Sequence, residues 1–466
     1  MPDDRRDPSR SRHLLSGLTQ FPSTSRLAAL INAHAPACRD GAFHVETCRV
    51  TDVIAGRRDT LFALVDATVV HAFDGGRSSR RLVFQRFPDQ ASAVEEARKV
   101  FRRLRHRART QGLKQDFRPW AGFIPEERVL LVPFPFDYRL PALVPACDPR
   151  TAGARLADLL GVEVTNCVVA PVRYVPHKRC QVRYDLTAAD GATVSVFGKL
   201  RTANQSEREV AWMQSLHASF AAGGVAATPA PIGYVGDWGM LVQRAAPGET
   251  LYALQRNTQD RIEIYERTGE ALAVLHTTPL DHLPSHLVPD ELAMLLTMLQ
   301  KTRLPPAELR TASEVLDWLT RTATLVPLSP AGTSHRDFYD KQVLAGPDGV
   351  WLIDFDTLAH APHVIDVGNF IAHLRLRERQ GYLTHHRARS AAIGFLNGYR
   401  RHRPVDDHAV DWCVAAALLR LAGVYVVRPE WSHLSGPLLA DAMECLPMSS
   451  TVHRRVLCDE RRTVAP

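Results

Sequence analysis

Residues 334–374 read SHRDFYDKQVLAGPDGVWLIDFDTLAHAPHVIDVGNFIAHL, and this stretch carries the strongest structural signal in the chain. It contains two short apolar runs, at 343–345 and 350–353, on either side of the sequence GPDG at 346–349. Gly, Pro and Asp together favour a tight turn, and apolar runs on both sides of a turn favour paired strands. The stretch therefore predicts a hairpin with its turn at 346–349.

This hairpin gathers polar side chains at its open end. Folding the chain about the turn places position 342 opposite position 353, so Gln342 ends beside Asp354, and Asp337 lies one short loop away. Carboxylate and carboxamide oxygens suit Mg²⁺, which binds through one or two carboxylates together with phosphate oxygens. One carboxylate is then left to accept a hydroxyl proton. That division of roles is what phosphoryl transfer requires.

Three motifs within the same stretch resemble those of the aminoglycoside phosphotransferases, choline kinases and protein kinases. HRDFYDKQ at 335–342 resembles their catalytic loop His-x-Asp-x-x-x-x-Asn, and LIDFD at 352–356 resembles their metal-binding segment. HVIDVGNFIAHL at 363–374 resembles the helix start that follows in the small-molecule kinases. The resemblance, which covers about residues 165–430, implies an α+β, protein-kinase-like two-lobed fold and the use of ATP and Mg²⁺.

Roles in the larger lobe follow from this resemblance. Asp337 is the expected catalytic residue, and the expected metal ligands are Asp354, Gln342 and Asp356. Gln342 replaces the usual Asn, which adds one methylene to a metal ligand. Asp366 is expected to accept backbone hydrogen bonds that hold the catalytic loop, because a carboxylate is favoured at the amino end of a helix.

Roles in the smaller lobe follow in the same way. VFGKL places Lys199 at the end of a strand, as the phosphate-pairing lysine is placed, and Glu209 (or Glu207) in the next helix would hold it by an ion pair. The first hairpin, VRYVPHKRCQVRY, has no Gly-rich turn, so Lys178 and Arg179 would replace backbone contacts to phosphate. Backbone groups from Gln243 to Ala245 would contact the adenine.

The strand and helix pattern of the smaller lobe occurs twice in the chain. In the first copy Arg86 stands where Lys199 stands in the second, and no catalytic motif accompanies it, so we expect no second enzyme there. A structural role is favoured over a regulatory one. The expected parts are a disordered amino-terminal segment at 1–24, a degenerate copy of the smaller lobe at 25–155, the smaller lobe at 156–254, the helical larger lobe with the catalytic loop at 255–450 and a tail at 451–466.

Composition narrows the function classes. The formal net charge is +7, with a basic run RRLRHRAR at 102–109, but no nucleic-acid-binding motif accompanies this run, so a solvated helix face is favoured over a nucleic-acid surface. The eight cysteines form no Cys-x-x-Cys pair. The most apolar stretch, 411–427, contains Asp411 and Arg420 and predicts a buried helix rather than a membrane span. A cytoplasmic location is expected.

The leading hypothesis is an ATP-dependent kinase that phosphorylates a hydroxyl of a small molecule. The alternative is a catalytically weak or inactive nucleotide-binding pseudokinase with a regulatory role, which Gln342 and the missing Gly-rich turn favour. A protein kinase is disfavoured, because no Ala-Pro-Glu segment or long activation loop follows Asp354. The acceptor substrate and the oligomeric state are left open.

Overall fold

A computed structural model of the protein describes residues 23–446, apart from 57–59, 111–112, 203–206, 225, 329–330 and 429. The chain forms two compact units, Met1–Ala211 with Ala230–Ala245 (unit 1) and Trp212–Pro229 with Ala246–Pro466 (unit 2). Residues 1–22 of the amino-terminal segment expected at 1–24 lie outside the described residues. The whole of the tail expected at 451–466 also lies outside them. Mixed sheets and helices confirm the predicted α+β class.

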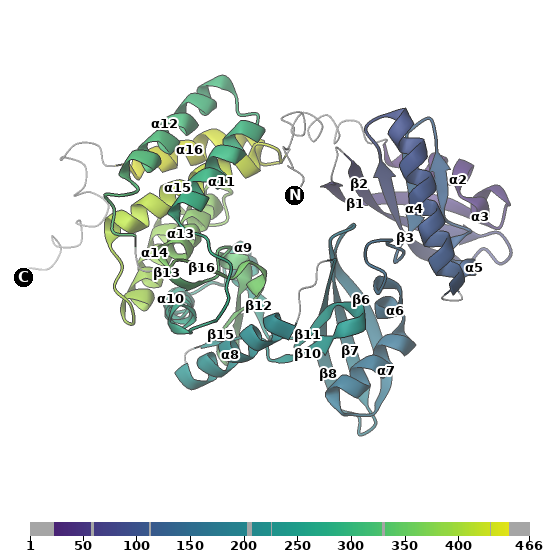
Figure 1. The fold of residues 1–466 in the computed structure, drawn as a ribbon, viewed down its shortest axis with the longest axis horizontal. Coiled ribbons are helices and arrows are strands. Elements are labelled where there is room, and N and C mark those ends of the chain that lie inside the picture. Colours follow the sequence, from purple (N-terminus) through teal and green to yellow (C-terminus); the bar gives the residue numbers. More distant parts are fainter. Residues whose placement is uncertain are drawn as a thin grey trace, which may run out of the picture. The chain divides into compact units, whose positions relative to one another are not determined.

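Unit 1 contains two five-stranded antiparallel sheets (Figure 1). The strand order is β1-β2-β3-β5-β4 in the amino-terminal sheet and β6-β7-β8-β11-β10 in the second sheet, so the two sheets share one topology. The strands are β1 (Phe43–Ala55), β2 (Leu61–His71), β3 (Arg77–Arg86), β4 (Gly122–Ile124), β5 (Val129–Pro133), β6 (Val164–Val175), β7 (Arg179–Ala188), β8 (Thr193–Arg201), β10 (Pro231–Val235) and β11 (Met240–Arg244).

The pairing register of the strands shows which residues correspond in the two sheets. Arg86 near the end of β3 pairs with Val129 at the start of β5, and Lys199 near the end of β8 pairs with Leu241 near the start of β11. Arg86 and Lys199 therefore occupy equivalent places in the two sheets. A long helix follows each of these strands in the chain, α4 (Gln90–Thr110) after β3 and α8 (Glu207–Gly223) after β8.

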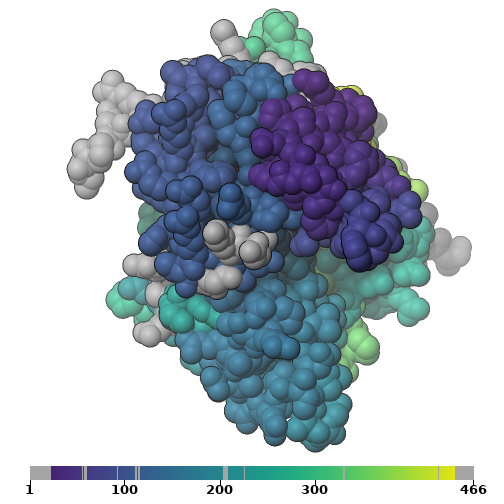
Figure 2. All heavy atoms as spheres, turned by 90° about the vertical axis from the view of Figure 1, so that its right-hand side faces the viewer, coloured from purple at the N-terminus to yellow at the C-terminus, as the bar shows by residue number. Residues whose placement is uncertain are grey.

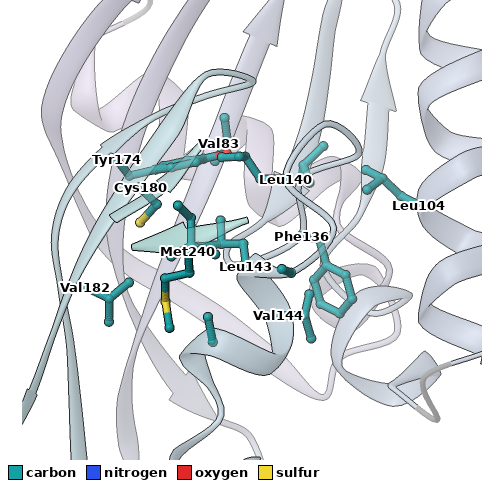
Figure 3. Packing of buried hydrophobic residues seen from close by; sticks show 14 of the residues in the cluster. Val83, Leu104, Phe136, Leu140, Leu143, Val144, Tyr174, Cys180, Val182 and Met240 are labelled. Carbon is teal, nitrogen blue, oxygen red and sulfur yellow. The ribbon is translucent and has the colours of Figure 1, made fainter. Parts of the chain in front are cut away.

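The two sheets share one apolar core. This core joins residues of β3, α4 and the segment after β5 to residues of β6, β7 and β11, and Figure 3 shows Leu143 of one side next to Met240 of the other. In the space-filling view, the purple and blue side chains of the amino-terminal sheet and its helices lie against the lighter blue ones of the second sheet (Figure 2). Burial of apolar surface on both sides therefore stabilises unit 1 as one body.

Helices complete unit 1. α2 (Thr24–His34) and α3 (Pro36–Arg39) cover the other face of the amino-terminal sheet, where Leu27 and Ile31 are fully buried. The boundary expected at 155/156 falls inside α7 (Pro149–Leu160), which begins at the Asp148 cap and packs on β6 and β10. The remaining helices are α5 (Lys114–Phe117), α6 (Leu143–Cys147) and the 3₁₀ turn η1 (Gly236–Trp238).

The basic run at 102–109 lies on α4. Leu104 and Ala108 point into the shared core, while Arg102, Arg105 and Arg109 are exposed. Arg107 instead donates to the carbonyls of Asp137 and Tyr138, at 3.2 and 3.3 Å. The run is thus one amphipathic helix with a solvated basic face, and one of its arginines holds the loop after β5.

Asp137 in that loop connects the two sheets by hydrogen bonds. The carboxylate is 3% exposed and accepts from the Tyr174 hydroxyl at the end of β6 and from the His177 N–H in the β6–β7 turn, both at 2.8 Å. Its other oxygen accepts from the N–H groups of Arg139 and Leu140. The amino-terminal half of unit 1 therefore fixes the turn that connects β6 and β7.

Unit 2 is mainly helical. A four-stranded sheet, β12-β14-β15-β9, and a two-stranded sheet, β13-β16, lie beside the helices. The strands are β9 (Ala226–Ala227), β12 (Glu249–Thr250), β13 (Ala331–Ser334), β14 (Val343–Gly346), β15 (Gly349–Leu352) and β16 (Ala359–Pro362). The helices are α9 (Leu251–Arg256), α10 (Ile262–Thr277), α11 (Val288–Lys301), α12 (Pro306–Thr322), α13 (Val364–Arg379), α14 (His385–Arg400), α15 (Asp407–Tyr425) and α16 (Ser435–Glu444), with 3₁₀ turns η2 (Asp340–Gln342), η3 (Phe355–Thr357) and η4 (Ser432–Leu434).

The core of unit 2 consists of α13 and α15, which pack against each other and are buried along most of their lengths. α15 is long and apolar enough to cross a membrane by length and composition, but 78% of its most apolar window is buried inside the structure. The prediction of a buried helix at 411–427 is confirmed. The expected lobe boundary at 254/255 falls inside α9, and the units instead divide after Ala245.

Candidate active site

The predicted hairpin forms with the predicted register. β14 and β15 pair from Val343↔Leu352 to Gly346↔Gly349, and the Ile353 N–H donates to the carbonyl of Gln342 at 3.0 Å. Position 342 therefore lies opposite position 353, as the sequence indicated. Gln342 itself is 6% exposed and ends the 3₁₀ turn η2.

A buried carboxylate holds the loop that carries Asp337. Asp366 on α13 accepts the N–H groups of His335 and Arg336, both at 2.6 Å, and also lies 3.1 Å from His276 Nε2. Burial alone would raise the pKa of Asp366, but these hydrogen bonds lower it below its usual range. The expected role of Asp366 is confirmed, and Asp337 directly follows the two anchored N–H groups.

Two residues of the site adopt left-handed backbone conformations. Arg336 and Asp354 both have a φ of 65°, which costs a non-glycine residue about 1–3 kcal/mol. Asp366 compensates this cost at Arg336, because its carboxylate accepts the Arg336 N–H at 2.6 Å. Asp354 takes the same conformation where β15 ends and η3 begins, so the chain changes direction at the carboxylate that follows the strand.

His335 connects the catalytic loop to the hairpin. Its Nε2–H donates to the Ile353 carbonyl at 3.0 Å, and its own carbonyl accepts from the Thr357 hydroxyl at 2.7 Å. The ring is fully buried and its Nδ1 has no hydrogen-bond partner among the described residues. His335 thus positions the residues around Asp354 and Asp337.

Further contacts fix the far side of the loop. Arg377 of α13 binds Asp340 through two hydrogen bonds of 2.6 and 2.9 Å, with both side chains buried. Burial would lower the pKa of Arg377, yet the charge of Asp340 raises it above its usual value. Asn369, also on α13, donates from Nδ2 to the Phe338 carbonyl at 2.9 Å. The loop between Asp337 and Gln342 is therefore anchored by α13 at both ends.

A pocket of about 170 Å³ opens beside Asp337 within unit 2. Arg336, Thr357 and Asn369 contribute polar wall atoms near the loop, and α11 contributes Glu291. The apolar wall comes mainly from α15 and is completed by residues of α11 and α13. It is lined by Met294, Ile365, Trp412, Cys413, Ala416 and Ala417, and Arg420 completes the wall.

The residues predicted to bind nucleotide lie in unit 1. Lys199 is on β8, opposite Gln181 of β7 and Leu241 of β11, and its side chain is half-buried. Glu209 Oε1 lies 3.8 Å from Arg201 Nη1, so this glutamate faces the residue two positions after Lys199. The side chain of Glu207 is outside the described part of the structure.

The β6–β7 turn differs from a mobile Gly-rich turn. His177 at its tip has a φ of 63° and packs edge-on against Phe62 and Tyr138. Lys178 next to it is exposed, and Arg179 begins β7, paired with Val175 and Arg201. The turn presents cationic side chains on a backbone held by the amino-terminal half of unit 1.

The connector after β11 offers fewer backbone donors than the sequence suggested. Gln243 is paired on both sides, with Phe197 of β8 and Pro231 of β10. The Ala245 N–H donates to the Ser195 carbonyl at 2.9 Å, because sheet pairing continues one residue past β11. The Ala245 N–H is therefore already engaged, and the expected contact of backbone groups from Gln243 to Ala245 with adenine stays a prediction. A contact at Ala245 would use its carbonyl.

The donor set near the hairpin fits a hard divalent cation. Asp354, Asp356 and Gln342 supply carboxylate and carboxamide oxygens, which Mg²⁺ prefers. Among the described residues no group of three or more His, Cys, Asp or Glu side chains gathers into a metal site. Two carboxylates and one carboxamide are a donor set that suits a cation completed by phosphate oxygens rather than one enclosed by protein ligands.

The sequence reasoning did not assign four residues of this region: Asn369, Arg420, Glu291 and His286. Asn369 stands inside the motif at 363–374, three residues after Asp366, on the same face of a helix. Arg420 interrupts an otherwise apolar helix, which is itself a signal of a polar role. Glu291 and His286 carried no sequence signal, because Glu291 reaches the pocket from a separate helix, α11, and His286 lies in the segment before that helix, where it contacts Glu291 and Arg336.

Comparison with known proteins agrees with the motifs. Residues 181–405 match the model of a family described as the phosphotransferase enzyme family. This range contains Lys199 and Glu209 of unit 1 and Asp337, Gln342 and Asp354 of unit 2. No curated protein sequence matches the chain.

Several solved structures are similar at low sequence identity. Amicoumacin kinase in complex with AMP-PNP, Ca²⁺ and Ami is 13% identical, with a TM-score of 0.47 over 65% of this chain and 96% of that chain. A choline/ethanolamine kinase family protein from Mesorhizobium loti is 14% identical, with a TM-score of 0.43 over 65% and 92%. A macrolide 2′-phosphotransferase from Brachybacterium faecium is 14% identical, with a TM-score of 0.39 over 64% and 97%. Each match spans nearly all of the other protein.

Proposed function

Since this chain carries a domain of the phosphotransferase enzyme family, we propose that it is an ATP-dependent, cytoplasmic kinase that phosphorylates a hydroxyl of a small molecule. One observation carries the proposal. The loop anchored by Asp366 presents Asp337 at the wall of a 170 Å³ pocket. A carboxylate in that place can hold an acceptor hydroxyl by a hydrogen bond and take its proton.

The proposed reaction assigns a distinct role to each group. The acceptor oxygen forms a bond to the γ-phosphorus of ATP, the bond from that phosphorus to the β–γ bridging oxygen breaks, and ADP leaves. The hydroxyl proton passes to Asp337. Asp354, Gln342 and Asp356 would hold Mg²⁺, which supplies charge neutralisation on the phosphates. Lys199, with Lys178 and Arg179, would supply positive charge to the phosphates from unit 1.

Positioning accounts for most of the rate enhancement in this proposal. Phosphoryl transfer needs little covalent participation from the protein, so an aligned acceptor and a stabilised phosphate are sufficient. The anchored loop meets the first requirement, because Asp366, His335 and Asn369 fix the backbone on both sides of Asp337. Gln342 in place of Asn keeps a carboxamide oxygen on a side chain longer by one methylene.

A set of three variants tests the proposal. Asp337→Asn should lower phosphoryl transfer by about 10²–10⁴-fold and leave ATP affinity unchanged, since asparagine keeps the shape but cannot take the proton. Asp354→Asn should lower transfer and also weaken ATP binding in the presence of Mg²⁺. The exposed Asp348 in the turn of the same hairpin provides the control, and Asp348→Asn should behave as the wild type.

Transfer is measured as ADP release against a panel of hydroxylated metabolites, or as ATP hydrolysis by water, and ATP affinity by calorimetry. Equal loss of ATP binding in Asp337→Asn and Asp354→Asn would refute the assigned roles. An inactive wild type that binds ATP would support the pseudokinase hypothesis instead.

A further inference from the structure

The pocket beside Asp337 is walled by two arginines that form no ion pair with a carboxylate in the described part of the chain. Arg420 of α15 donates to Asn369 Oδ1, a neutral acceptor, and Arg336 Nη2 lies 3.3 Å from His286 Nε2. Within the described residues, no carboxylate oxygen lies within 4 Å of either guanidinium. Two unneutralised guanidinium groups therefore line one pocket.

The carboxylates in the pocket wall are engaged elsewhere. Glu291 Oε2 lies 2.7 Å from His286 Nε2, with both side chains buried. Asp337 is the carboxylate that the proposed reaction reserves for the acceptor hydroxyl. Neither acid forms an ion pair with the arginines among the described residues. Burial lowers the pKa of Arg336 below its usual value, the charges of Glu291 and Asp366 offset only part of this effect, and the charge of Arg420 lowers the pKa further.

Neighbouring hydrogen bonds orient Arg420. Asn369 donates from Nδ2 to the Phe338 carbonyl while its Oδ1 accepts from Arg420. The His373 Nδ1–H donates to the Asn369 carbonyl at 2.9 Å, one helical turn along α13. The guanidinium of Arg420 is therefore tied, through one side chain, to the residue that follows Asp337. Arg420 would therefore hold a bound ligand at a fixed position relative to the carboxylate of Asp337.

We infer that the acceptor carries an anionic group, a carboxylate or a phosphate monoester, which Arg336 and Arg420 bind while its hydroxyl lies at Asp337. The inference rests on the proposed kinase function and names the substrate class of the same pocket. Guanidinium groups bind such anions through two parallel hydrogen bonds. A polycationic acceptor would face two arginines and is disfavoured.

Size and wall chemistry limit the rest of the acceptor. A cavity of about 150 Å³ holds one benzene ring, so 170 Å³ admits about one six-membered ring. The wall opposite the polar residues is formed by Trp412, Met294 and Ile365, which favour an apolar or weakly polar ring face. The part of the acceptor inside the pocket is therefore a single hydroxylated ring or a short chain with one anionic group.

A matched ligand series tests this on the full-length protein. The four probes share a six-membered ring and a hydroxyl: trans-4-hydroxycyclohexanecarboxylate, its uncharged amide, trans-4-aminocyclohexanol and the mono-phosphate of cyclohexane-1,4-diol. Calorimetric titration should give a Kd at least about tenfold lower for one of the two anions than for the amide, a difference of about 1.4 kcal/mol. The amine should bind more weakly than the amide. The tighter of the two anions then identifies the group.

Variants of Arg420 separate charge from shape. Arg420→Leu should reduce the preference for the anion over the amide to about threefold or less, and Arg420→Lys should retain part of it. Arg428, exposed eight residues further along, provides the matched control, and Arg428→Leu should keep the wild-type preference. The wild-type series alone decides the question if Arg420→Leu does not fold.

Three results would overturn the inference: the amide binding as tightly as both anions, the amine binding tightest, or no probe binding at all. ADP release is followed with the same probes. Transfer to the amine alone would overturn the inference and leave the kinase function standing. Anion-selective binding without transfer to any acceptor, and without ATP binding, would support the pocket assignment and refute the kinase function.

Discussion

The carboxylate of Asp137 provides a sharp test of how the two sheets of unit 1 are coupled. Asp137→Ala removes the acceptor of four donors: the Tyr174 hydroxyl and the N–H groups of His177, Arg139 and Leu140. Asp137 and Tyr174 are 3% and 5% exposed, so water cannot easily replace the lost oxygen. We expect the loss to weaken unit 1 and to release the β6–β7 turn.

The magnitude follows from the number of donors left without a partner. Each buried donor without an acceptor costs about 1–3 kcal/mol, but relaxation of the loop makes such costs less than additive. Removal of one partner from a buried charged network typically costs about 3–5 kcal/mol. We expect Asp137→Ala to lower the free energy of unfolding of unit 1 by about 3 kcal/mol. At about 2–4 °C per kcal/mol, its Tm should fall by about 6–12 °C.

Hydrogen exchange read by mass spectrometry gives a local measurement. The peptide that contains residues 172–180 should exchange faster in Asp137→Ala, because the His177 N–H loses its acceptor. Asp137→Asn keeps one carbonyl oxygen and should lose about half as much stability. The control is Asp74→Ala, which removes an exposed turn carboxylate bonded to the Gly76 N–H and should change stability by about 0.5 kcal/mol or less.

A double-mutant cycle with Tyr174→Phe isolates the pair across the two sheets. Coupling of about 0.5–3 kcal/mol is expected for residues in one hydrogen-bonded network. A loss below 1 kcal/mol in Asp137→Ala, or unchanged exchange at residues 172–180, would refute the view that the amino-terminal half holds this turn.

Two further predictions concern unit 2. Gln342→Asn should keep the rate of phosphoryl transfer within about tenfold of the wild-type rate, about 1.4 kcal/mol in the barrier, because the shorter carboxamide still supplies an oxygen. The rate is measured as steady-state ADP release. A larger loss would show that the site requires the longer side chain. His363 should make unit 2 less stable in acid, since burial, aided by nearby His276, lowers its pKa to about 3. Below about pH 6.5 the unfolded chain therefore binds a proton at His363 that the folded chain does not bind. The free energy of unfolding is highest above that pH and falls by about 2 kcal/mol between pH 7 and 5. Urea unfolding at both pH values checks this, and an unchanged slope in His363→Gln would refute it.

The sequence by itself determined the local features of the site. The GPDG turn sets the hairpin and its register, because a two-strand ladder about a tight turn has one alignment, and Gln342 therefore lies opposite Ile353. The position of Asp366 at the start of α13 predicted that it would accept backbone hydrogen bonds from the loop, since a carboxylate is favoured at the amino end of a helix. The repeated strand pattern likewise predicted two sheets of one topology.

Only the tertiary structure decided how distant segments meet. α11 brings Glu291 and α15 brings Arg420 to the wall beside Asp337, although 46 and 83 residues separate them from it, because apolar helix packing rather than local pattern places them there. The boundary expected at 155/156 lies inside α7 for the same reason, since that helix buries its apolar face on the second sheet. Turns and strand register depend on residues that are close in the sequence. The packing of apolar helix faces depends instead on segments that are far apart in the sequence and meet only in the folded protein.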